Sequence, residues 1–527
     1  MFRFLVRKLR QIASSGPGVP NSDQGQKTGA RVGRNLEVNI RTIQEAFGDS
    51  RDLIIRRVHI SPLGLDAAVL FLEGMVDARL VSAALIEPLL STHHGSSARA
   101  GTSAIDTIER RLVSVANTRR TYLVREMLGA ILSGEALLLL DGIEQALMAN
   151  VRGWQARAIT EATSDVVFKG PRDGFVETLQ TNIALLRRRI KNQDLTLESI
   201  VLGQRTRTPV AIGYIRSLAN EELLAELRRR LGRIEIDSVL DSQYVAELIS
   251  DTPFSPVVSV ASTERPDVVA SRLLEGRVTV LVDGSPFALT LPSLFAEGFQ
   301  SAQDYYYSPY FQSFLRIIRY AAFGFNILAL PYYIAVTTFH QQLVPTPLLL
   351  TIAASKEGTP FPVAFEAAMM LLFFEVLRES SMRTPRALGQ TVSIVGALVV
   401  GQTAVMAGIV GAPVVIITAL TAISSFVVPA HVDSGAIARL LLIILASTTG
   451  FYGLAMGLIM MLVHVSSLSS FGVPMLSPVA PLHTGDMKDT PVRSPWWAMD
   501  TRPTASQPQD LEREASQPVR RHRAGGD

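Results

Sequence analysis

Two glutamates, Glu366 and Glu375, lie inside a long apolar segment that carries almost no other charge. A carboxylate at membrane depth costs several kcal/mol, so such a group usually faces a water-filled path or a polar partner. At about 100° of helix per residue, the nine-residue separation places the two carboxylates on opposite faces. We predict that Glu366, Gln390 and Gln402 line an ion pathway. Glu375 is a further candidate for that pathway, although a salt bridge with Arg378 is a simpler role for it.

A basic cluster, Arg187-Arg188-Arg189, ends a helix that the apolar spacing of residues 175–190 predicts. Positive charges there complement the negative end of the helix dipole, which explains the cluster without a partner. The alternative is docking against acidic groups of a partner protein or against anionic lipid head groups. The sequence leaves both interpretations open.

Metal, cofactor and nucleophile chemistry finds no support in the sequence. There is no cysteine, which excludes disulfides, thiolate metal sites and cysteine nucleophiles. The adjacent pair His93-His94 lies in a polar stretch that is typical of a solvated loop. No P-loop, HExxH, GxSxG or dinucleotide-binding motif is present, so we predict neither an enzyme nor a bound metal or cofactor. The formal net charge of +3 gives no indication of nucleic-acid binding.

The C-terminal third has the pattern of a membrane protein. Mean hydropathy is +0.26, and the apolar excess comes from long runs with few charges. Since about 20 apolar residues cross a hydrocarbon core, we predict an all-α multi-pass bundle over residues 313–475 with about four to six spans. The expected apolar helices cover residues 314–336, 361–377, 391–410, 414–428 and 440–465. The last stretch is either one long tilted helix or two short helices.

The sidedness of these spans follows from charge. Positive residues in short loops mark the cytoplasmic side, and the N-terminal part has no export signal, so we expect that part to be cytoplasmic. The arginine-rich end of the chain prefers the same side, which requires an even number of crossings. Five apolar stretches are evident. Either residues 361–377 are therefore re-entrant or the last stretch is a hairpin.

The preceding residues alternate between helix and strand patterns. They predict an α/β (α+β) soluble part in two lobes, residues 35–165 and residues 166–312. We expect the basic leader, residues 1–34, and the tail, residues 476–527, to be flexible. Asp173 is the expected N-cap of the helix over residues 175–190. Expected strands cover residues 53–60, 136–140, 143–151, 197–202, 210–215, 257–260, 278–282 and 287–291, and the other expected helices cover 75–90, 221–231 and 267–274. No repeat of the solenoid type is visible.

Several long blocks of sequence resemble a known family. They include Gly170-Pro171-Arg172-Asp173, Glu264-Arg265-Pro266-Asp267, Asp304-Tyr305-Tyr306-Tyr307, Pro360-Phe361-Pro362 and Ser470-Phe471-Gly472-Val473-Pro474. In this order, over about residues 35–485, they are similar to the signature segments of the GerA-type spore germination proteins, the A subunits of spore germinant receptors.

This resemblance implies a non-enzymatic receptor subunit in the inner membrane of a bacterial endospore. It also implies a permease-like B subunit and a lipoprotein C subunit as partners, and a homo-oligomer that forms an ion-conducting path. One alternative is an accessory of solute release similar to stage V sporulation protein AF. Another is a secondary transporter that binds its own substrate near Pro360-Phe361-Pro362, which the absence of an inverted repeat disfavours.

Overall fold

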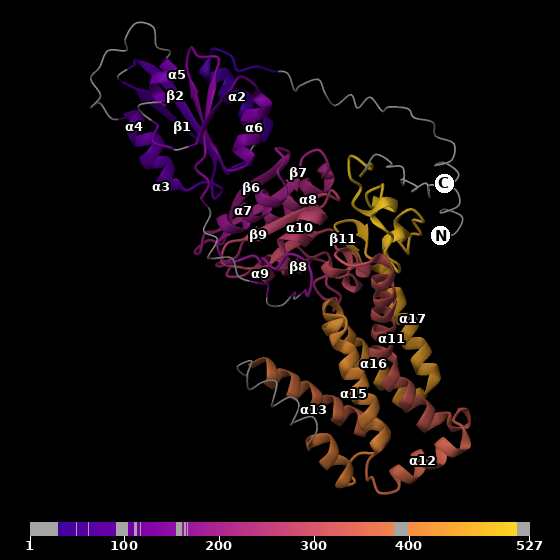
Figure 1. Cartoon of the computed structure of the whole chain (residues 1–527). Helices are drawn as coiled ribbons and strands as arrows, with labels where there is room; N and C mark the ends of the chain where they lie inside the picture. The colour runs from indigo at the N-terminus through magenta and orange to yellow at the C-terminus, as the bar shows by residue number, and fades with distance from the viewer. Residues whose placement is uncertain are drawn as a thin grey trace, which may run out of the picture. The chain divides into compact units, whose positions relative to one another are not determined.

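The computed structural model describes residues 30–513 except 49, 62, 91–103, 110–112, 116, 154–160, 163–164, 166 and 384–398. Most of the predicted leader and both His93 and His94 thus lie outside the described residues. The chain divides into two compact units. Unit 1 comprises residues up to Pro253, Val260–Ser293 and residues from Pro495, and unit 2 comprises Phe254–Ser259 and Leu294–Ser494. Mixed sheets and helices followed by a helical part confirm the predicted fold class (Figure 1).

The first sheet of unit 1 has five antiparallel strands in the order β1-β2-β4-β5-β3. They are β1 (Leu53–Ile60), β2 (Leu65–Leu72), β3 (Thr118–Thr121), β4 (Ala136–Leu140) and β5 (Ala146–Ala149). Every residue of β4 is buried because alternate side chains enter two cores. Leu137 and Leu139 pack on one face of the sheet, and Leu138 and Leu140 pack on the other. The predicted strand 53–60 and the hairpin after residue 136 are confirmed.

Helices cover both faces of this sheet (Figure 1). One face packs against α2 (Leu36–Phe47) and α6 (Val124–Leu132). The other packs against α5 (Ala104–Thr107) and against a helix that changes its winding, made of α3 (Ala78–Val81), the π-helical η1 (Ser82–Ile86) and α4 (Glu87–Leu90). Asp77 caps the start of α3, so the helix predicted from residue 75 begins slightly later.

The second sheet also has five antiparallel strands, in the order β6-β7-β9-β10-β8. They are β6 (Leu195–Leu202), β7 (Thr208–Ile215), β8 (Ala261–Thr263), β9 (Val278–Val282) and β10 (Ala288–Leu291). One face packs against α7 (Leu179–Arg189) and α10 (Pro266–Leu273). The helices α8 (Glu221–Leu231) and α9 (Ser242–Ile249) follow β7 and complete this part of the unit.

The two sheets form a tandem repeat, because the second strand order reproduces the first with every strand at the same place. We call residues 31–153 repeat 1 and residues 174–293 repeat 2. Asn39 exchanges two hydrogen bonds with the backbone of Gly33 (2.9 and 2.7 Å), and Asn182 does the same with Val176 (2.8 and 2.6 Å). The same side chain thus fixes the approach to the first helix of each repeat.

The turn after the central strand is duplicated as well. Asp141 Oδ1 accepts a bond from the first N–H of α2, and Asp283 Oδ1 accepts one from the first N–H of α7, both at 3.0 Å. The glycine that follows each aspartate, Gly142 or Gly284, has a positive φ and donates its N–H to the segment before the helix. The shared strand order and these shared hydrogen bonds define the repeat.

Two local predictions in the part of the chain before α11 are wrong. Helix α7 begins at Leu179 with Thr178 as its N-cap, so Asp173 is not the cap and Phe175 precedes the helix. The reason is the Asn182 clamp on Val176, which holds the chain extended before α7. Residues 257–260 form no strand, and the strand β8 begins at Ala261.

Unit 2 is mainly helical. Its helices are α11 (Pro309–Phe339), α12 (Thr346–Lys356), α13 (Val363–Arg383), α15 (Ala412–Phe426), α16 (Val432–Thr449) and α17 (Phe451–Ser467). Short elements complete it, namely the 3-10 helices η4 (Phe295–Phe299), η5 (Ala302–Tyr305), η6 (Gln341–Leu343) and η7 (Pro429–His431) and the hairpin β11 (Ser469–Ser470) with β12 (Val473–Pro474). Among the described residues, two helices are long and apolar enough to cross a membrane, α11 and the stretch Pro429–Thr449. Helices α15 and α17 are apolar but shorter.

Helix α11 is the centre of the helical unit, since α15, α16 and α17 all pack against it (Figure 1). The apolar stretch 440–465 is two helices rather than one, because Gly450 adopts a φ of +63° and ends α16. Helices α16 and α17 then pack side by side. Part of the predicted span 391–410 lies outside the described residues, and residues 399–406 of it are helical.

The sequence predicts a flexible tail from residue 476, and the structure differs up to residue 513. This stretch contains the 3-10 helices η8 (Asp486–Asp489), η9 (Trp496–Ala498) and η10 (Thr504–Ser506). Arg493, Met499 and Ser506 within it are buried. The described part of the tail is therefore packed. Its side chains and backbone form hydrogen bonds and ion pairs with residues elsewhere in the chain, and the amino-acid composition of the tail does not predict these contacts.

Candidate functional site

Glu366 lies fully buried in the first turn of α13. Its carboxylate accepts the N–H of Gly411 (3.0 Å), the N-cap residue of α15, and the hydroxyl of Thr359 (3.0 Å). The ammonium of Lys356 lies 3.7 Å away. The first predicted pathway residue thus joins the segment between α12 and α13 to the start of α15, and its charge is balanced by a helix N-terminus and a lysine.

Glu375 lies further along α13 and joins three helices. Its carboxylate contacts Arg378 at 2.7 Å and Arg439 of α16 at 3.4 Å. Arg439 is buried and also donates to Asn326 of α11 at 2.5 Å. The predicted pairing of Glu375 with Arg378 is present, and Arg439 extends it to a link between α13, α16 and α11. The buried Arg439 thus has both a carboxylate and an amide partner, as a charged group requires away from water.

The two predicted glutamines are placed differently. Gln402 lies on the short helix over residues 399–406 with an exposed side chain, and Gln390 lies outside the described residues. In the described part of unit 2, three buried hydroxyls have no hydrogen-bond partner, those of Tyr333, Thr418 and Thr421. These hydroxyls on α11 and α15 can therefore still form hydrogen bonds inside the helical unit.

A buried charge network lies at the start of α11. Asp304 is fully buried and accepts bonds from Arg316 (3.3 and 3.1 Å) and Arg319 (2.7 and 2.8 Å). Asp489 of the tail accepts bonds from Arg316 (2.9 Å) and the Tyr305 hydroxyl (2.6 Å). Two carboxylates therefore neutralise two guanidinium groups, and the tail contributes one of them. The network fixes the end of α11 from which the helical unit begins.

Two arginines of the basic cluster at the end of α7, Arg187 and Arg189, form ion pairs within unit 1, and Arg188 is half-buried. Arg187 is buried and forms a bidentate pair with Asp52 of repeat 1 (2.7 and 2.9 Å), and it also donates to Ser50. Arg189 pairs with Asp173 at 2.6 Å. Arg187 therefore has no surface to offer a lipid or partner in this structure, because it links repeat 2 to repeat 1.

The block around Gly170 is held by a second arginine. Arg265 is buried, pairs with Asp267 at 2.7 Å and donates to the carbonyl of Pro171 at 2.9 Å. Gly170 has a φ of +124°, a conformation that favours glycine. Arg172 pairs with Glu161 at the surface, at 3.4 Å. These motif residues shape the entry into repeat 2.

The Pro360-Phe361-Pro362 block positions Glu366. The Pro362 carbonyl accepts the N–H of Glu366 at 3.1 Å and starts α13. Phe361 is partly exposed, and its ring centroid lies 4.8 Å from that of Phe365. The block thus sets where the buried carboxylate enters the helical unit.

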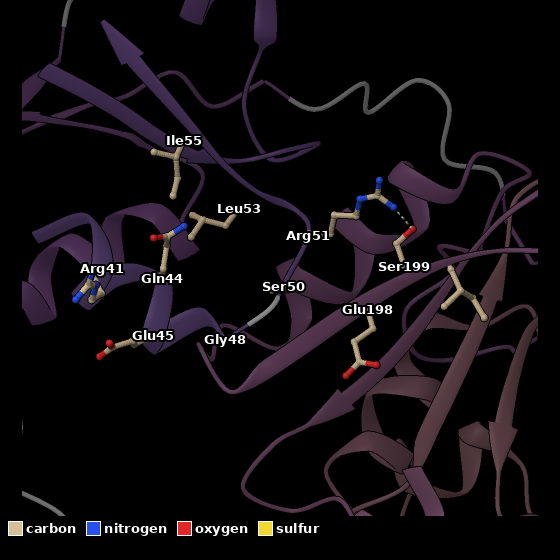
Figure 2. A pocket seen from close by; sticks show the side chains of 11 residues that line it. Arg41, Gln44, Glu45, Gly48, Ser50, Arg51, Leu53, Ile55, Glu198 and Ser199 are labelled. Atoms are coloured by element: carbon tan, nitrogen blue, oxygen red, sulfur yellow. Dashed lines mark hydrogen bonds between the residues drawn. The ribbon is translucent and has the colours of Figure 1, made fainter. Parts of the chain in front are cut away.

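An open cleft of about 840 Å³ lies in unit 1 between the outer strands β1 and β6 (Figure 2). Arg41, Gln44 and Glu45 of α2 line one side, as Figure 2 shows. On the other side, Arg51 donates to Ser199 at 2.9 Å. The carboxylate of Glu198 is bound by Arg228 and Tyr214, which lie outside the lining. Because the charged group of the β6 wall is already engaged, we place the candidate site in the buried polar links of unit 2.

Two residues of these links were missed from the sequence, Arg439 and Asp489. Arg439 had a visible signal, since it is an isolated cation within a long apolar stretch. Asp489 had none, because it lies in a polar segment whose composition is typical of a flexible tail. Within the described ranges, no cluster of three or more His, Asp or Glu side chains could hold a metal ion.

Comparison with known proteins shows relatives that match most of this chain. Spore germination protein KA of Bacillus subtilis is 42% identical over 486 residues, which cover 92% of this chain and 89% of that protein. The uncharacterized membrane protein YfkQ of the same organism is 37% identical over 90% of this chain and 91% of its own length. Spore germination protein GerLA of Bacillus cereus is 34% identical over 90% of this chain and 96% of its own length.

A crystal structure of the N-terminal domain of the A subunit of the Bacillus megaterium spore germinant receptor GerK3 shares 34% sequence identity with this chain. The match covers 51% of this chain and 99% of that domain, with a TM-score of 0.41. The family model of the Bacillus/Clostridium GerA spore germination proteins matches residues 41–505 of this chain. This chain therefore belongs to the GerA family of spore germination proteins.

Proposed function

We propose that this chain is the A subunit of a spore germinant receptor, which converts nutrient binding by a partner into germination. The observation that carries the proposal is the 42% identity to a spore germination protein over 92% of this chain. The proposed partners are a permease-like B subunit that holds the nutrient, a lipoprotein C subunit and further copies of this chain. Germination then requires a shift between two states with different contacts.

The proposed location is the inner membrane of the spore, with unit 1 in the cytoplasm. Asp489 binds Arg316 near the N-terminus of α11. This contact supports the proposal that the C-terminal tail lies on the same side of the membrane as the N-terminus of α11. The break at Gly450 supports a hairpin of α16 and α17. Counting this hairpin as two crossings removes the odd number of spans that the apolar stretches alone suggest.

The proposed ion pathway includes Glu366 and Glu375, with Gln402 and Gln390 as further candidates. Support comes from the burial of Glu366 and from the three-helix link around Glu375. Both carboxylates lie where a small helix movement would change their partners. Buried ionisable groups of this kind usually mark transport or signalling paths in membrane proteins.

The test is germination of spores that lack the gene, with single amino acids, sugars and nucleosides as nutrients. We expect the response to one nutrient class to disappear and to return with the intact gene. Glu366→Gln should reduce the restored response at least tenfold, because it removes the charge that Gly411 and Lys356 balance.

The matched control is Glu357→Gln, since Glu357 is exposed and ends the neighbouring α12. It should leave the response unchanged. A wild-type response from Glu366→Gln at normal protein abundance would remove Glu366 from the pathway. Normal germination of gene-deleted spores with every nutrient would contradict the receptor role itself.

A further inference from the structure

The tail is bound at its first part to the start of α11. Arg316 donates to the backbone carbonyl of Asp489 (2.7 Å) as well as to its carboxylate (2.9 Å), and Gln300 donates to the same carbonyl (2.9 Å). The hydroxyl of Ser313 donates to the carbonyl of Arg493 at 3.1 Å. Charge-assisted bonds of this type are stronger than neutral ones. Residues 489–493 are therefore a firmly held helix-side anchor within unit 2.

The second part of the tail is bound to repeat 2. Arg502 donates to the carbonyl of Leu274 (2.9 Å), and Ser506 donates to the carbonyl of Glu275 (2.8 Å). The backbone N–H of Gln509 donates to Leu218 at 3.0 Å. The accepting carbonyls lie where α10 ends and where the chain turns after β7. Residues 502–509 are a repeat-side anchor within unit 1.

Repeat 1 explains why repeat 2 needs this anchor. Gly134 and Gly276 are equivalent, with φ values of +81° and +82°, and each lies against a backbone carbonyl of its own repeat. In repeat 1, the chain that leaves β5 returns over this glycine, and Arg152 lies beside it. In repeat 2, the chain that leaves β10 continues towards α11 instead. Pro508 of the tail occupies the corresponding place beside Gly276.

We propose that residues 486–513 form a strap that couples repeat 2 to the start of α11. Asp489 is its latch on the helix side, and the stretch from Arg502 to Gln509 is its latch on the repeat side. A rearrangement of repeat 2 that releases the second latch loosens the hold of Asp489 on Arg316, so the two latches open together. As a step in germination, this inference rests on the proposed receptor function, but the coupling itself can be measured without it.

The first experiment uses the absence of cysteine from the chain. Thr490→Cys introduces one thiol beside the helix-side latch, at a position that is only 6% exposed. In isolated membranes that contain the full chain, a thiol reagent should label this variant slowly. Adding Arg502→Ala and Ser506→Ala, which act only on the repeat-side latch, should raise the labelling rate at least tenfold.

The labelling experiment has two controls. Thr501→Cys lies at an exposed position and should react quickly in every background. Arg34→Ala removes an exposed pair with Glu144 in repeat 1 and should leave the labelling of Thr490→Cys unchanged. If opening the repeat-side latch does not change that labelling, the strap does not couple the two anchors and the proposal is overturned.

The second experiment measures germination with chains shortened at two points. A chain that ends at Asp500 lacks the repeat-side latch and should lose at least nine-tenths of its germination rate. A chain that ends at Arg513 keeps both anchors and should respond normally. Equal responses at normal abundance would overturn the strap as a germination element, whereas no response even from the intact chain would contradict the receptor function and leave the labelling result to decide the coupling.

Discussion

Repeat 1 and repeat 2 have the same strand order, the same asparagine clamp and the same aspartate at the central turn. They differ in what happens after the last strand. Repeat 1 closes over its own glycine turn with Arg152, whereas the chain of repeat 2 continues into the helical unit and Pro508, from much later in the sequence, lies beside its glycine turn. The departures from the common plan therefore show where each repeat connects to the rest of the protein.

A second difference lies at the end of the first helix. Repeat 2 has Arg187 where repeat 1 has Gln44, and Arg187 reaches Asp52 of repeat 1. The counterpart of Asp52 is Asp194, which accepts a bond only from its own repeat, from Ser217 at 3.0 Å. One repeat thus supplies the cation and the other the buried carboxylate. This unequal pair therefore joins the two similar repeats within unit 1.

The largest expected effect comes from breaking this pair. Asp52→Ala should lower the free energy of unfolding by about 3–5 kcal/mol, since it leaves the buried guanidinium of Arg187 without its carboxylate. Asp194→Ala, the equivalent change in repeat 2, should cost less than about 1 kcal/mol because its bond is partly solvated. Denaturant unfolding of the detergent-solubilised chain measures both. Equal losses from the two variants would show that the repeats are joined without help from this pair.

A smaller effect is expected at the equivalent glycines. In both Gly134→Ala and Gly276→Ala the new methyl would lie 2.8 Å from a backbone carbonyl at a positive φ, which should cost about 1–3 kcal/mol. Only in Gly276→Ala would the new methyl also clash with Pro508, whose Cβ lies 2.7 Å away. Hydrogen exchange of residues 502–509 should therefore rise in that variant alone. If exchange there is unchanged although the variant loses the expected stability, binding of the tail does not depend on the glycine turn.

The sequence predicted elements whose patterns are local and missed features that depend on distant partners. The predicted strand 53–60 and the predicted helix 221–231 match β1 and α8, because alternation and the stop at Gly232 are local signals. The start of α7 was wrong because Asn182 acts back on Val176. The duplication was not recognised because its markers are hydrogen bonds of a few polar side chains, and some of these join residues that lie far apart in the sequence.

The candidate site follows the same division. Glu366 and Glu375 were evident as isolated charges in an apolar segment, and the structure places both in polar links between helices. What the sequence did not reveal is that Arg439 and Asp489 complete those links from far along the chain. A partner some hundred residues away leaves no periodic signal, so only the packed structure identifies it.

The smallest expected difference between the repeats is a response to acid. Burial raises the pKa of Glu198, but hydrogen bonds from Arg228 and Tyr214 outweigh it and leave that pKa below its usual value. Burial and the bond to Glu198 raise the pKa of Tyr214 to about 12. Strand register places Arg56 and Phe71 at the corresponding positions of repeat 1, so the pair exists only in repeat 2.

Because the folded pKa of Glu198 is lowered, its contribution is complete above the unfolded value of about 4.3 and is lost as the pH falls below it. A partly buried pair of this kind contributes about 1 kcal/mol, or roughly a fivefold change in local opening. Hydrogen exchange between pH 7 and pH 3, corrected for the intrinsic rate, should therefore accelerate several-fold more in β6 and β7 than in β1 and β2. Glu198→Gln should reduce this difference, because it removes the carboxylate that Arg228 and Tyr214 bind in repeat 2 and that repeat 1 lacks at this position. An equal response of the two repeats in the unaltered chain would mean that other carboxylates dominate the acid sensitivity of unit 1.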